Sequence, residues 1–240
     1  MSVEALLREV AGQGVELWVE GARLRFRSPR GALSGPHRTA LASERGSVIA
    51  MLRSRAEAHC TVQPLSYNQR ALWFIHQEAP ASTAYHVAQA VRIVTPIRLE
   101  ALHHALQGLS DRHPMLRTTY ALSDDGLLQQ HTRGAVDVAF RQLSAAGASD
   151  EAMHAMLDDE FARPFDLDEG PVFRASLITR ADDEHLLLIV MHHIAGDGWS
   201  LVMMMDEFRA LYAEACGESG VLPPRVDHTY ADFVDRKAHV

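Results

Sequence analysis

The chain has 240 residues, of which 47% are hydrophobic and 22% charged, an ordinary composition for a globular protein and too apolar for a disordered one. Its net charge of −8 argues against a nucleic acid as the main partner. The longest uncharged apolar stretch, Leu186 to Met191, is too short to span a membrane, and no signal-like segment opens the chain. With two cysteines, Cys60 and Cys216, no disulfide framework is expected, and a reducing cytoplasm is the predicted location.

The first sixty residues differ in charge from the rest and are predicted to form a separate small unit, residues 1–60. They hold nine arginines and six acidic residues, whereas the remainder of the chain is acidic. Helical spacing of apolar residues predicts a helix near residues 3–12. Two alternating runs around Gly21-Ala22 predict a β-hairpin. Two further helices are expected at about Pro36–Ser43 and Glu44–Glu57.

The alternation in the second hairpin strand predicts which side chains share a face. Leu24 and Phe26 are expected in the small core, which leaves Arg23, Arg25 and Arg27 on the other face. A solvated strand face is one interpretation of this pattern. The other is an exposed, arginine-lined strand that receives an extended acidic peptide by edge pairing and charge complementarity.

The string Gly14-Val15-Glu16-Leu17-Trp18-Val19-Glu20-Gly21, with Ser28-Pro29-Arg30-Gly31 after it, resembles the TubC-type N-terminal docking domain. The resemblance covers nearly all of residues 2–57. Members of that family stand at the N-terminus of nonribosomal peptide synthetase subunits and bind a short acidic motif at the C-terminus of the preceding synthase subunit. The resemblance therefore implies an upstream subunit as partner, with Trp18, Arg23, Arg25 and Arg27 as docking residues.

The seam near His59–Pro64 contains no long linker and predicts a rigid or nearly direct junction to a second unit, residues 61–240. In that unit helices and strands are mixed, which favours a layered α/β arrangement over regular βαβ winding. Helices are predicted at Asn68–Gln77, Leu99–Arg112, Asp150–Ala162 and Leu201–Ala215, and extended segments at Val87–Val94, Leu116–Leu122, Leu127–Gln130, Val136–Leu143, Val172–Thr179 and His185–Met191.

The strongest chemical signal is His192-His193-Ile194-Ala195-Gly196-Asp197-Gly198, which follows a buried strand and leads through a tight turn into a helix. Adjacent strand residues point to opposite faces, so His192 and His193 cannot both face one substrate. The residues leave open a structural histidine pair, a metal site, or one neutral imidazole that acts as a base or positions a substrate. The opposed histidines and the lack of another ligand cluster argue against a metal, and none is predicted. Asp197 could orient the histidine or pair with a distant arginine.

The same segment matches the His-His-x-x-x-Asp-Gly motif of the nonribosomal peptide synthetase condensation domain. Three other segments resemble motifs of that family: Leu65-Ser66-Tyr67-Asn68-Gln69-Arg70-Ala71-Leu72-Trp73-Phe74, Arg112-His113-Pro114-Met115-Leu116-Arg117-Thr118-Thr119-Tyr120, and Pro164-Phe165-Asp166-Leu167 with Arg174. The family joins a donor acyl or peptidyl thioester to an acceptor amine, in antibiotic biosynthesis and other secondary metabolism. Both substrates are tethered by phosphopantetheine to carrier proteins, so the resemblance implies donor and acceptor carrier proteins as partners and no directly bound cofactor.

The resemblance also implies roles for single residues. His193 would be the catalytic histidine, either as the base that accepts the amine proton or as the group that holds the amine in place, and His192 is counted with it among the catalytic-site residues of the motif. Asp197 would be structural and paired to Arg117. Gly198 would let the backbone approach the substrate, and its N–H is a candidate oxyanion donor.

The family domain is a pseudodimer of two chloramphenicol-acetyltransferase-like lobes. The resemblance therefore implies an α+β or α/β fold: a small α-β-hairpin-αα docking domain, then one such lobe with a mixed sheet and flanking helices. Residues 61–240 would be the N-terminal, donor-side lobe of an incomplete domain, and this chain alone would be inactive. A binding or docking module without condensation activity is thus the alternative function.

Neighbouring families are distinguished by the same features. His192 argues against a heterocyclisation domain, and the leading docking unit argues against an epimerisation domain. Tyr67-Asn68 in the opening motif is similar to condensation domains that take a polyketide donor, which would indicate a hybrid polyketide/peptide system. Tyr230-Ala231-Asp232-Phe233 resembles the next motif of the family.

Overall fold

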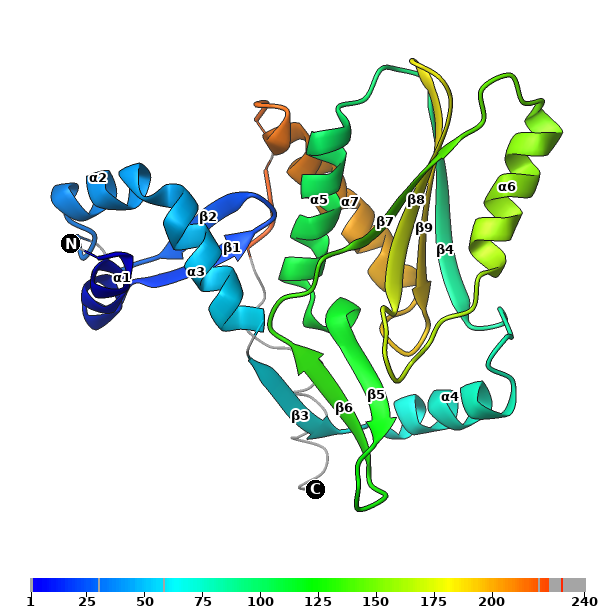
Figure 1. Ribbon diagram of the computed structural model, residues 1–240, viewed down its shortest axis with the longest axis horizontal. Helices are drawn as coiled ribbons and strands as arrows, with labels where there is room; N and C mark the ends of the chain where they lie inside the picture. The colour runs from blue at the N-terminus through cyan, green and yellow to red at the C-terminus, as the bar shows by residue number, and fades with distance from the viewer. Residues whose placement is uncertain (1, 30, 58, 220, 225–229, 231–240) are drawn as a thin grey trace.

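The computed structural model describes residues 2–29, 31–57, 59–219, 221–224 and 230, so residues 231–233 of the last motif lie outside the described residues. A small N-terminal unit stands beside a larger unit built on two sheets (Figure 1). The larger unit carries the His-His segment, and the small unit carries the arginine-rich hairpin.

The N-terminal unit has the predicted order of helix, hairpin, helix and helix. Its elements are α1 (Val3–Gly12), β1 (Glu16–Glu20), β2 (Arg23–Arg27), α2 (Gly35–Ser43) and α3 (Arg45–Glu57). Ser2 caps α1 and Ser34 caps α2, each by accepting a hydrogen bond from a first-turn amide. The helices and the hairpin enclose one apolar cluster, made of Leu6, Leu7, Val10, Val15, Leu33, Leu41 and Val48.

One expectation for the hairpin is wrong. Leu24 packs against the small core, as predicted from the alternation, but Phe26 is 54% exposed. Phe26 lies opposite Leu17 in the antiparallel pair, so the face assignment holds. The packed part of that face includes Leu17 and Leu24 and leaves the ring of Phe26 in solvent.

The junction between the units is direct. α3 ends at Glu57, and a strand that the sequence did not predict, β3 (Cys60–Pro64), begins three residues later and pairs with β6 (Leu128–Arg133) of the larger unit. The amide of Gly134 donates to the carbonyl of His59 over 2.9 Å. A Cβ atom on Gly134 would lie 2.2 Å from the carbonyl oxygen of Ala56, so only glycine allows this approach.

The larger unit contains two sheets. In the smaller one, β6 lies between β3 and β5 (Thr118–Leu122), and all pairs are antiparallel. The larger one has the order β4-β9-β8-β7, with β7 parallel to β8 and the other pairs antiparallel. Its strands are β4 (His86–Ile93), β7 (Ala139–Ser144), β8 (Phe173–Ala181) and β9 (Glu184–His192).

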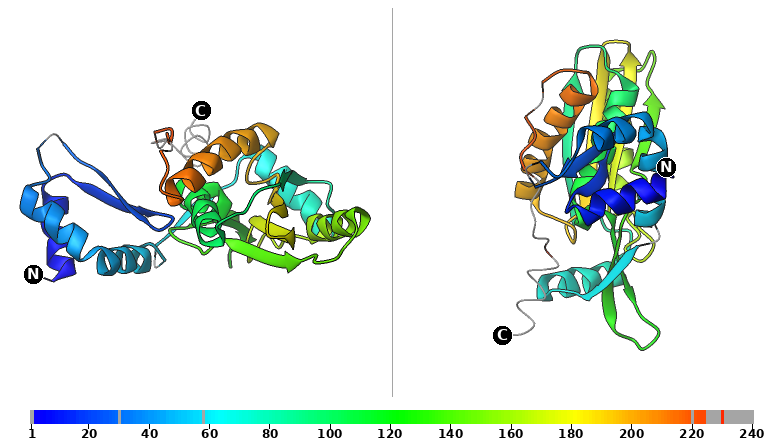
Figure 2. Two further views of the ribbon diagram at one scale, coloured as in Figure 1. Left: turned by 90° about the horizontal axis from the view of Figure 1, so that it is seen from above. Right: turned by 90° about the vertical axis from the view of Figure 1, so that its left-hand side faces the viewer.

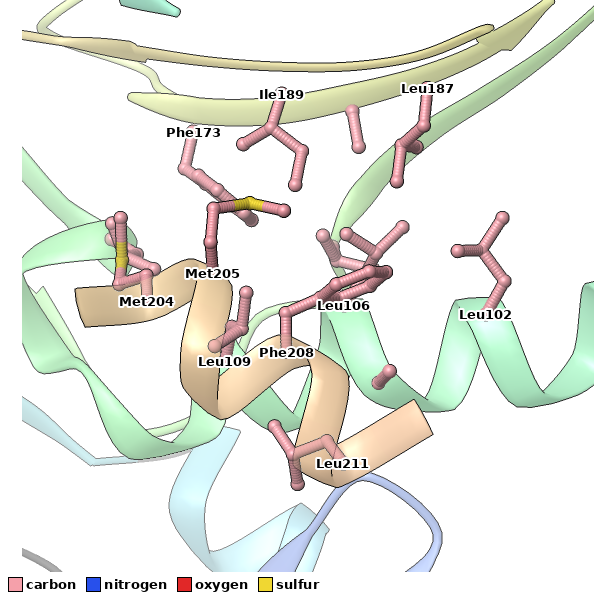
Figure 3. Packing of buried hydrophobic residues seen from close by; sticks show 14 of the residues in the cluster. Leu102, Leu106, Leu109, Phe173, Leu187, Ile189, Met204, Met205, Phe208 and Leu211 are labelled. Atoms are coloured by element: carbon pink, nitrogen blue, oxygen red, sulfur yellow. The ribbon is translucent and has the colours of Figure 1, made fainter. Parts of the chain in front are cut away.

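Helices cover both faces of the four-stranded sheet, which confirms the mixed sheet with flanking helices. α5 (Leu99–Arg112) and α7 (Gly198–Ala215) pack on one face, where leucines of α5 meet Met205 and Phe208 of α7 under Phe173 and Ile189 (Figure 3). α6 (Asp150–Ala162) lies against the opposite face, and α4 (Tyr67–Glu78) lies next to the small sheet (Figure 1).

The central strand β9 is buried on both sides, as its uninterrupted apolar run predicts. Leu187, Ile189 and Met191 face the α5–α7 layer. Leu188 and Val190 face a second cluster, on the side of α4 and β5. His192, the last residue of β9, continues the second set, so the period-two alternation of the strand determines which way its ring points.

The segment before β5 is a second local departure from the predicted elements of this unit, after β3. Extended structure is expected over Leu116–Leu122, but residues Pro114–Arg117 form a 3-10 turn and β5 begins at Thr118. Proline at the start of this turn has the backbone angle that a helical turn requires. The turn changes where Arg117 points, which matters for its predicted partner.

Candidate active site

His192 is a buried, neutral histidine. It is 2% exposed, and its Nδ1 accepts a hydrogen bond from the amide of Ile194 over 3.1 Å. Burial first, and the neighbouring imidazoles second, lower the pKa of His192 to about 3. Because Nδ1 is the acceptor, the single proton of the neutral ring is on Nε2. This geometry suits a structural role for His192.

His193 has the opposite environment. It follows the last residue of β9, its amide donates to the carbonyl of Tyr85 over 2.8 Å, and its side chain is exposed. The backbone of His193 is thus held by the residue that precedes β4, while its imidazole remains accessible to solvent. Of the two adjacent histidines, His193 is the one whose side chain is open to solvent.

Asp197 begins the next helix. It is the N-cap of α7, and its Oδ1 accepts hydrogen bonds from the amide and the hydroxyl of Ser200 over 2.8 and 2.6 Å. These bonds lower the pKa of Asp197 below its usual range, so the carboxylate is charged at neutral pH. The sequence motif therefore supplies a helix cap next to the exposed histidine.

Gly198 is the first helical residue of α7 and is exposed. An amide at this position has no acceptor within the helix and lies at the positive end of the helix dipole. A Cβ atom on Gly198 would meet nothing within 4 Å, so the protein itself does not crowd this position. Trp199, 74% exposed, stands beside it.

The expected ion pair between Arg117 and Asp197 does not form between these two described residues. Arg117 donates instead to backbone carbonyls, of Arg133 over 2.6 Å and of Asp111 over 3.2 Å, and also to that of Ser110. The 3-10 turn before β5 directs its guanidinium toward the end of α5. Arg117 thus links the end of α5 to β6. The carboxylate of Asp197 takes its hydrogen bonds from Ser200, in the first turn of α7.

The four sequence motifs converge on one buried cluster. Trp73 of α4 donates its indole N–H to the carbonyl of Tyr120 over 2.9 Å, and the amide of Tyr120 donates to the carbonyl of Leu167 over 2.7 Å. Ile194, from the His-His segment, is buried in the same cluster. Residues that are far apart in the chain therefore support the turn that carries His193.

Two further histidines lie beside His192 and were not singled out from the sequence. The ring of His76 stands edge-on to that of His192 at 5.5 Å, and His86 pairs with His192 across β4 and β9. Burial lowers the pKa of both His76 and His86. Neither belongs to a recognisable motif, so only the register of β4 against β9 and the packing of α4 reveal them.

A surface cavity of about 480 Å³ opens next to this histidine cluster. His76 and Phe165 belong to its lining, and Phe165 also contacts the ring of His192, with 6.0 Å between the ring centres. Asp166 and Asp168 add negative charge to the opening. Among the described residues, no group of three or more His, Cys, Asp or Glu side chains is arranged to hold a metal ion.

The predicted docking residues of the hairpin fall into two groups. Arg23 and Arg25 contact Glu214 of α7, in the larger unit. Arg27 lies farther along β2, with 4.0 Å between its Nη1 and Oε2 of Glu16. Trp18 lies opposite Arg25 in the hairpin. Two of the three arginines predicted to bind a partner peptide are therefore already paired with a carboxylate of the larger unit.

Comparison with known proteins assigns both units of the chain to families. Residues 60–240 match the condensation domain family and residues 3–54 match the TubC N-terminal docking domain family. The chain belongs to the condensation domain family of nonribosomal peptide synthetases and carries a TubC-type docking domain in front. No helix of the described residues is long and apolar enough to cross a membrane.

Curated relatives are large synthetases. The chain is 36% identical over 187 residues to malpinin synthetase of Mortierella alpina, a match that covers 77% of this chain and 2% of that protein. It is 36% identical over 178 residues to the phosphinothricin tripeptide synthetase PhsC of Streptomyces viridochromogenes, which covers 72% of this chain and 16% of that one. The chain thus spans a small part of the length of these relatives.

Solved structures agree on the fold. The starter condensation domain of rhizomide synthetase RzmA superposes with a TM-score of 0.65 at 26% identity, over 75% of this chain and 45% of that chain. The first condensation domain of the CDA synthetase superposes with a TM-score of 0.63 at 19% identity, which supports the fold alone. The chain spans less than half of either solved chain.

Proposed function

We propose that this chain contributes the His-His-x-x-x-Asp-Gly half of an active site that forms an amide bond between two carrier-tethered substrates. The observation that carries the proposal is the contrast between the two histidines. His193 is exposed at the end of the central strand, beside the N-terminus of α7, while His192 is buried with a pKa of about 3. This contrast supports His193 as the histidine that meets the substrate.

In the proposed reaction the acceptor amine attacks the carbonyl carbon of the donor thioester. A C–N bond forms and the C–S bond breaks. His193 takes the proton that the amine loses, or holds the amine by a hydrogen bond while the proton passes on, and the leaving sulfur departs as a free thiol. Positioning of the two tethered reactants supplies a large part of the rate enhancement.

The backbone next to His193 supports the same chemistry. The amide of Gly198 belongs to the first turn of α7 and is proposed to donate to the oxyanion that develops on the thioester carbonyl. Asp197 keeps this turn in place through its bonds to Ser200. Phosphopantetheine enters this proposal as the tether of the substrates, and donor and acceptor carrier proteins are the partners that bring them.

The test of the catalytic assignment is His193→Ala in the intact synthetase subunit. Loss of general-base or positioning catalysis is expected to slow amide formation by about 10²- to 10⁴-fold. His103→Ala is the matched control, because His103 is also an exposed histidine of the same unit but lies on α5. Product formation at the parent rate by the His193 variant, measured by mass spectrometry of the loaded carrier, would remove His193 from the mechanism.

We further propose that the N-terminal unit binds an acidic C-terminal motif of an upstream synthase subunit. The match of residues 3–54 to the docking family and the basic character of this unit support the idea. Since Arg23 and Arg25 are engaged by Glu214, Arg27 is the hairpin arginine to test first. Arg27→Ala is expected to weaken binding of the upstream C-terminal peptide in a titration, and the exposed Arg38→Ala is the control.

A second candidate function is a binding module without condensation activity. It is supported by the coverage of the solved relative, since the chain spans 45% of the RzmA starter condensation domain. A condensation assay on the 240-residue chain separates the two candidates. Amide product formed by this chain without any added protein lobe would contradict the binding-only function.

A further inference from the structure

The turn of the hairpin is inserted against α5 and α7 of the condensation lobe (Figure 2). The amide of Gly21 donates to Oδ2 of Asp111 over 2.8 Å, and its carbonyl accepts from Arg53 over 2.7 Å. Gly21 has a φ of +57°, and a Cβ atom there would lie 2.6 Å from the carbonyl oxygen of His104. The hairpin backbone therefore touches the backbone of α5, an approach that only glycine permits.

A buried charge network spans the contact. Glu20 of β1 and Glu207 of α7 both bind Arg112 of α5, over 2.8 and 2.9 Å, and His113 adds a 2.8 Å contact to Glu207. The side chains of Glu20 and Arg112 are 3% and 6% exposed. Burial opposes ionisation of Glu207, but hydrogen bonds from His113 and Arg112 outweigh it and lower the pKa of the carboxyl to about 2. Charges buried to this degree are stable only when all partners stay in place.

A second set of charges lies at the rim of the contact. Glu214 of α7 accepts from Arg23 over 2.8 Å and from Arg25 over 2.9 Å, and Arg25 also donates to Glu20 over 2.9 Å. Arg23 contacts the backbone carbonyl of Glu214 as well. Burial opposes the charge on Arg25, but its hydrogen bonds and its attraction to Glu214 and Glu20 raise the pKa of the guanidinium. The small crevice left between the hairpin turn and the two helices measures about 120 Å³.

We propose that these contacts form an interdomain clamp, made of Glu20, Gly21, Arg23 and Arg25 on the hairpin and of Asp111, Arg112, Glu207 and Glu214 on the lobe. The clamp fixes the docking unit to the condensation lobe as one rigid body. Arg23 and Arg25 are thereby residues of an interface within the chain, and their partner is the carboxylate of Glu214. Two of the three hairpin arginines of the proposed docking surface are therefore already engaged within the chain.

The direct junction strengthens the clamp. The chain passes from the end of α3 at Glu57 to the start of β3 at Cys60, and Gly134 closes on the end of α3. Among the described residues, the N-terminal unit is thus attached both near the end of α3, at the junction and through Arg53 to Asp137, and at the hairpin turn. Two attachments of this kind leave a small unit little freedom to rotate, whereas either one alone leaves a hinge.

A distance measurement by electron–electron double resonance tests the proposal. Spin labels are placed at Arg38→Cys on α2 and Asp158→Cys on α6, both exposed, in the 240-residue chain with Cys60→Ser and Cys216→Ser. The clamp predicts one narrow distance distribution. Gly21→Ala and Glu214→Gln are each expected to shift it to other distances and to broaden it.

Two matched controls separate loss of the clamp from general damage. Gly31→Ala places alanine at another glycine with positive φ, +84°, in the same docking unit, but its Cβ would meet nothing within 4 Å. Asp206→Asn removes a charge from α7 whose ion pair within the described part of the chain is with the exposed Arg209. Both controls are expected to keep the narrow distribution of the parent. Circular dichroism of each variant establishes that the chain is folded at the temperature of measurement.

A broad distribution in the parent, or the same narrow distribution in Gly21→Ala and Glu214→Gln, would overturn the clamp. The measurement contains no upstream partner, so it stands apart from the docking proposal. Failure of an acidic peptide to bind would contradict docking and leave the clamp intact.

Discussion

At the end of β9, two adjacent imidazoles have different surroundings because a strand alternates its side chains. His192 continues the inward series of Leu188 and Val190 and is enclosed by aromatic rings, whereas His193 emerges where the strand ends. Burial makes the charged form of His192 unfavourable, and the hydrogen bond from Ile194 fixes its tautomer. One histidine thereby supports the turn, and the imidazole of the other is left open to solvent.

The buried ring gives a pH dependence of stability. The pKa of His192 is about 3 in the folded chain and near 6.5 when exposed, so between these values the unfolded chain binds a proton that the folded chain does not. Stability therefore falls as the pH drops below about 6.5, and the contribution of His192 amounts to about 2 kcal/mol between about pH 7 and pH 5. His192→Asn keeps an acceptor for the amide of Ile194 and is expected to reduce this slope. Urea unfolding of both proteins at several pH values measures it, and parallel slopes would contradict the assignment.

At the scale of elements, the start of α7 depends on one side chain. Asp197 accepts from both the amide and the hydroxyl of Ser200, and Ser200 in turn accepts weakly from the amide of Asp197, at 3.4 Å. This capping box sets the position at which the helix begins, and with it the orientation of the amide of Gly198. The acidic residue of the motif is therefore explained by helix geometry without the predicted arginine.

Asp197→Ala is expected to lower the free energy of unfolding by about 0.5–2 kcal/mol, the usual cost of losing an N-cap. Asp197→Ser supplies another good cap and is expected to retain most of the stability. Thermal or urea unfolding of the two variants gives the comparison. Equal losses in both would mean that the carboxylate acts through some contact other than the cap.

Across the whole molecule, the two units share a buried arginine. Arg112 joins Glu20 of the docking unit to Glu207 of the lobe and also donates to the carbonyl of Pro223 over 2.9 Å. Burial opposes its charge, but hydrogen bonds and attraction from the two carboxylates raise the pKa of the guanidinium. The interface between the units thus resembles a polar interior more than a surface contact.

Arg112→Met is expected to destabilise the chain by about 3–5 kcal/mol, because it leaves Glu20 and Glu207 buried without their shared cation. Arg209→Met is the control: Arg209 pairs with Asp206 at the surface, and its loss is expected to change stability by less than about 1 kcal/mol. Urea unfolding of the 240-residue chain provides both values. A loss in Arg112→Met no larger than in the control would mean that the network contributes nothing net.

Much of this architecture could be predicted from the sequence, since periodicity is a local property. The helices at Leu99–Arg112 and Asp150–Ala162 have the predicted bounds, and the buried strand before His192 was expected from its apolar run. β3 was missed because residues Cys60–Pro64 are few, largely exposed and end in a proline, so that only their pairing with β6 makes them a strand. The 3-10 turn at Pro114 was missed for a similar reason, since the proline could begin either a turn or an extended segment.

In the candidate site, too, features set by neighbouring residues could be predicted, whereas contacts between distant segments could not. The different exposure of His192 and His193 follows from strand alternation, which is visible in the sequence. The partners of Arg117, Arg23 and Arg25 depend on how α5, α7 and the hairpin meet, and no local pattern encodes that meeting. A run of arginines on a strand predicts a negatively charged partner. In the folded chain that partner is Glu214 of α7, which pairs with Arg23 and Arg25.

The contact of the hairpin with α5 and α7 has a consequence for the exchange of domains between synthetases. An exchange of N-terminal docking units cut at the family boundary, between residues 54 and 60, would leave β3 with the recipient but replace the hairpin that lies on α5 and α7. A donor unit that lacks an acidic residue at position 20 would leave Arg112 without its hairpin counterpart, and one that lacks basic side chains at positions 23 and 25 would leave Glu214 without its partners. A side chain in place of glycine at position 21 would collide with the backbone of α5. Compatible chimeras should therefore be chosen by matching the hairpin turn to the helices of the recipient lobe, and the cut site alone is an insufficient criterion.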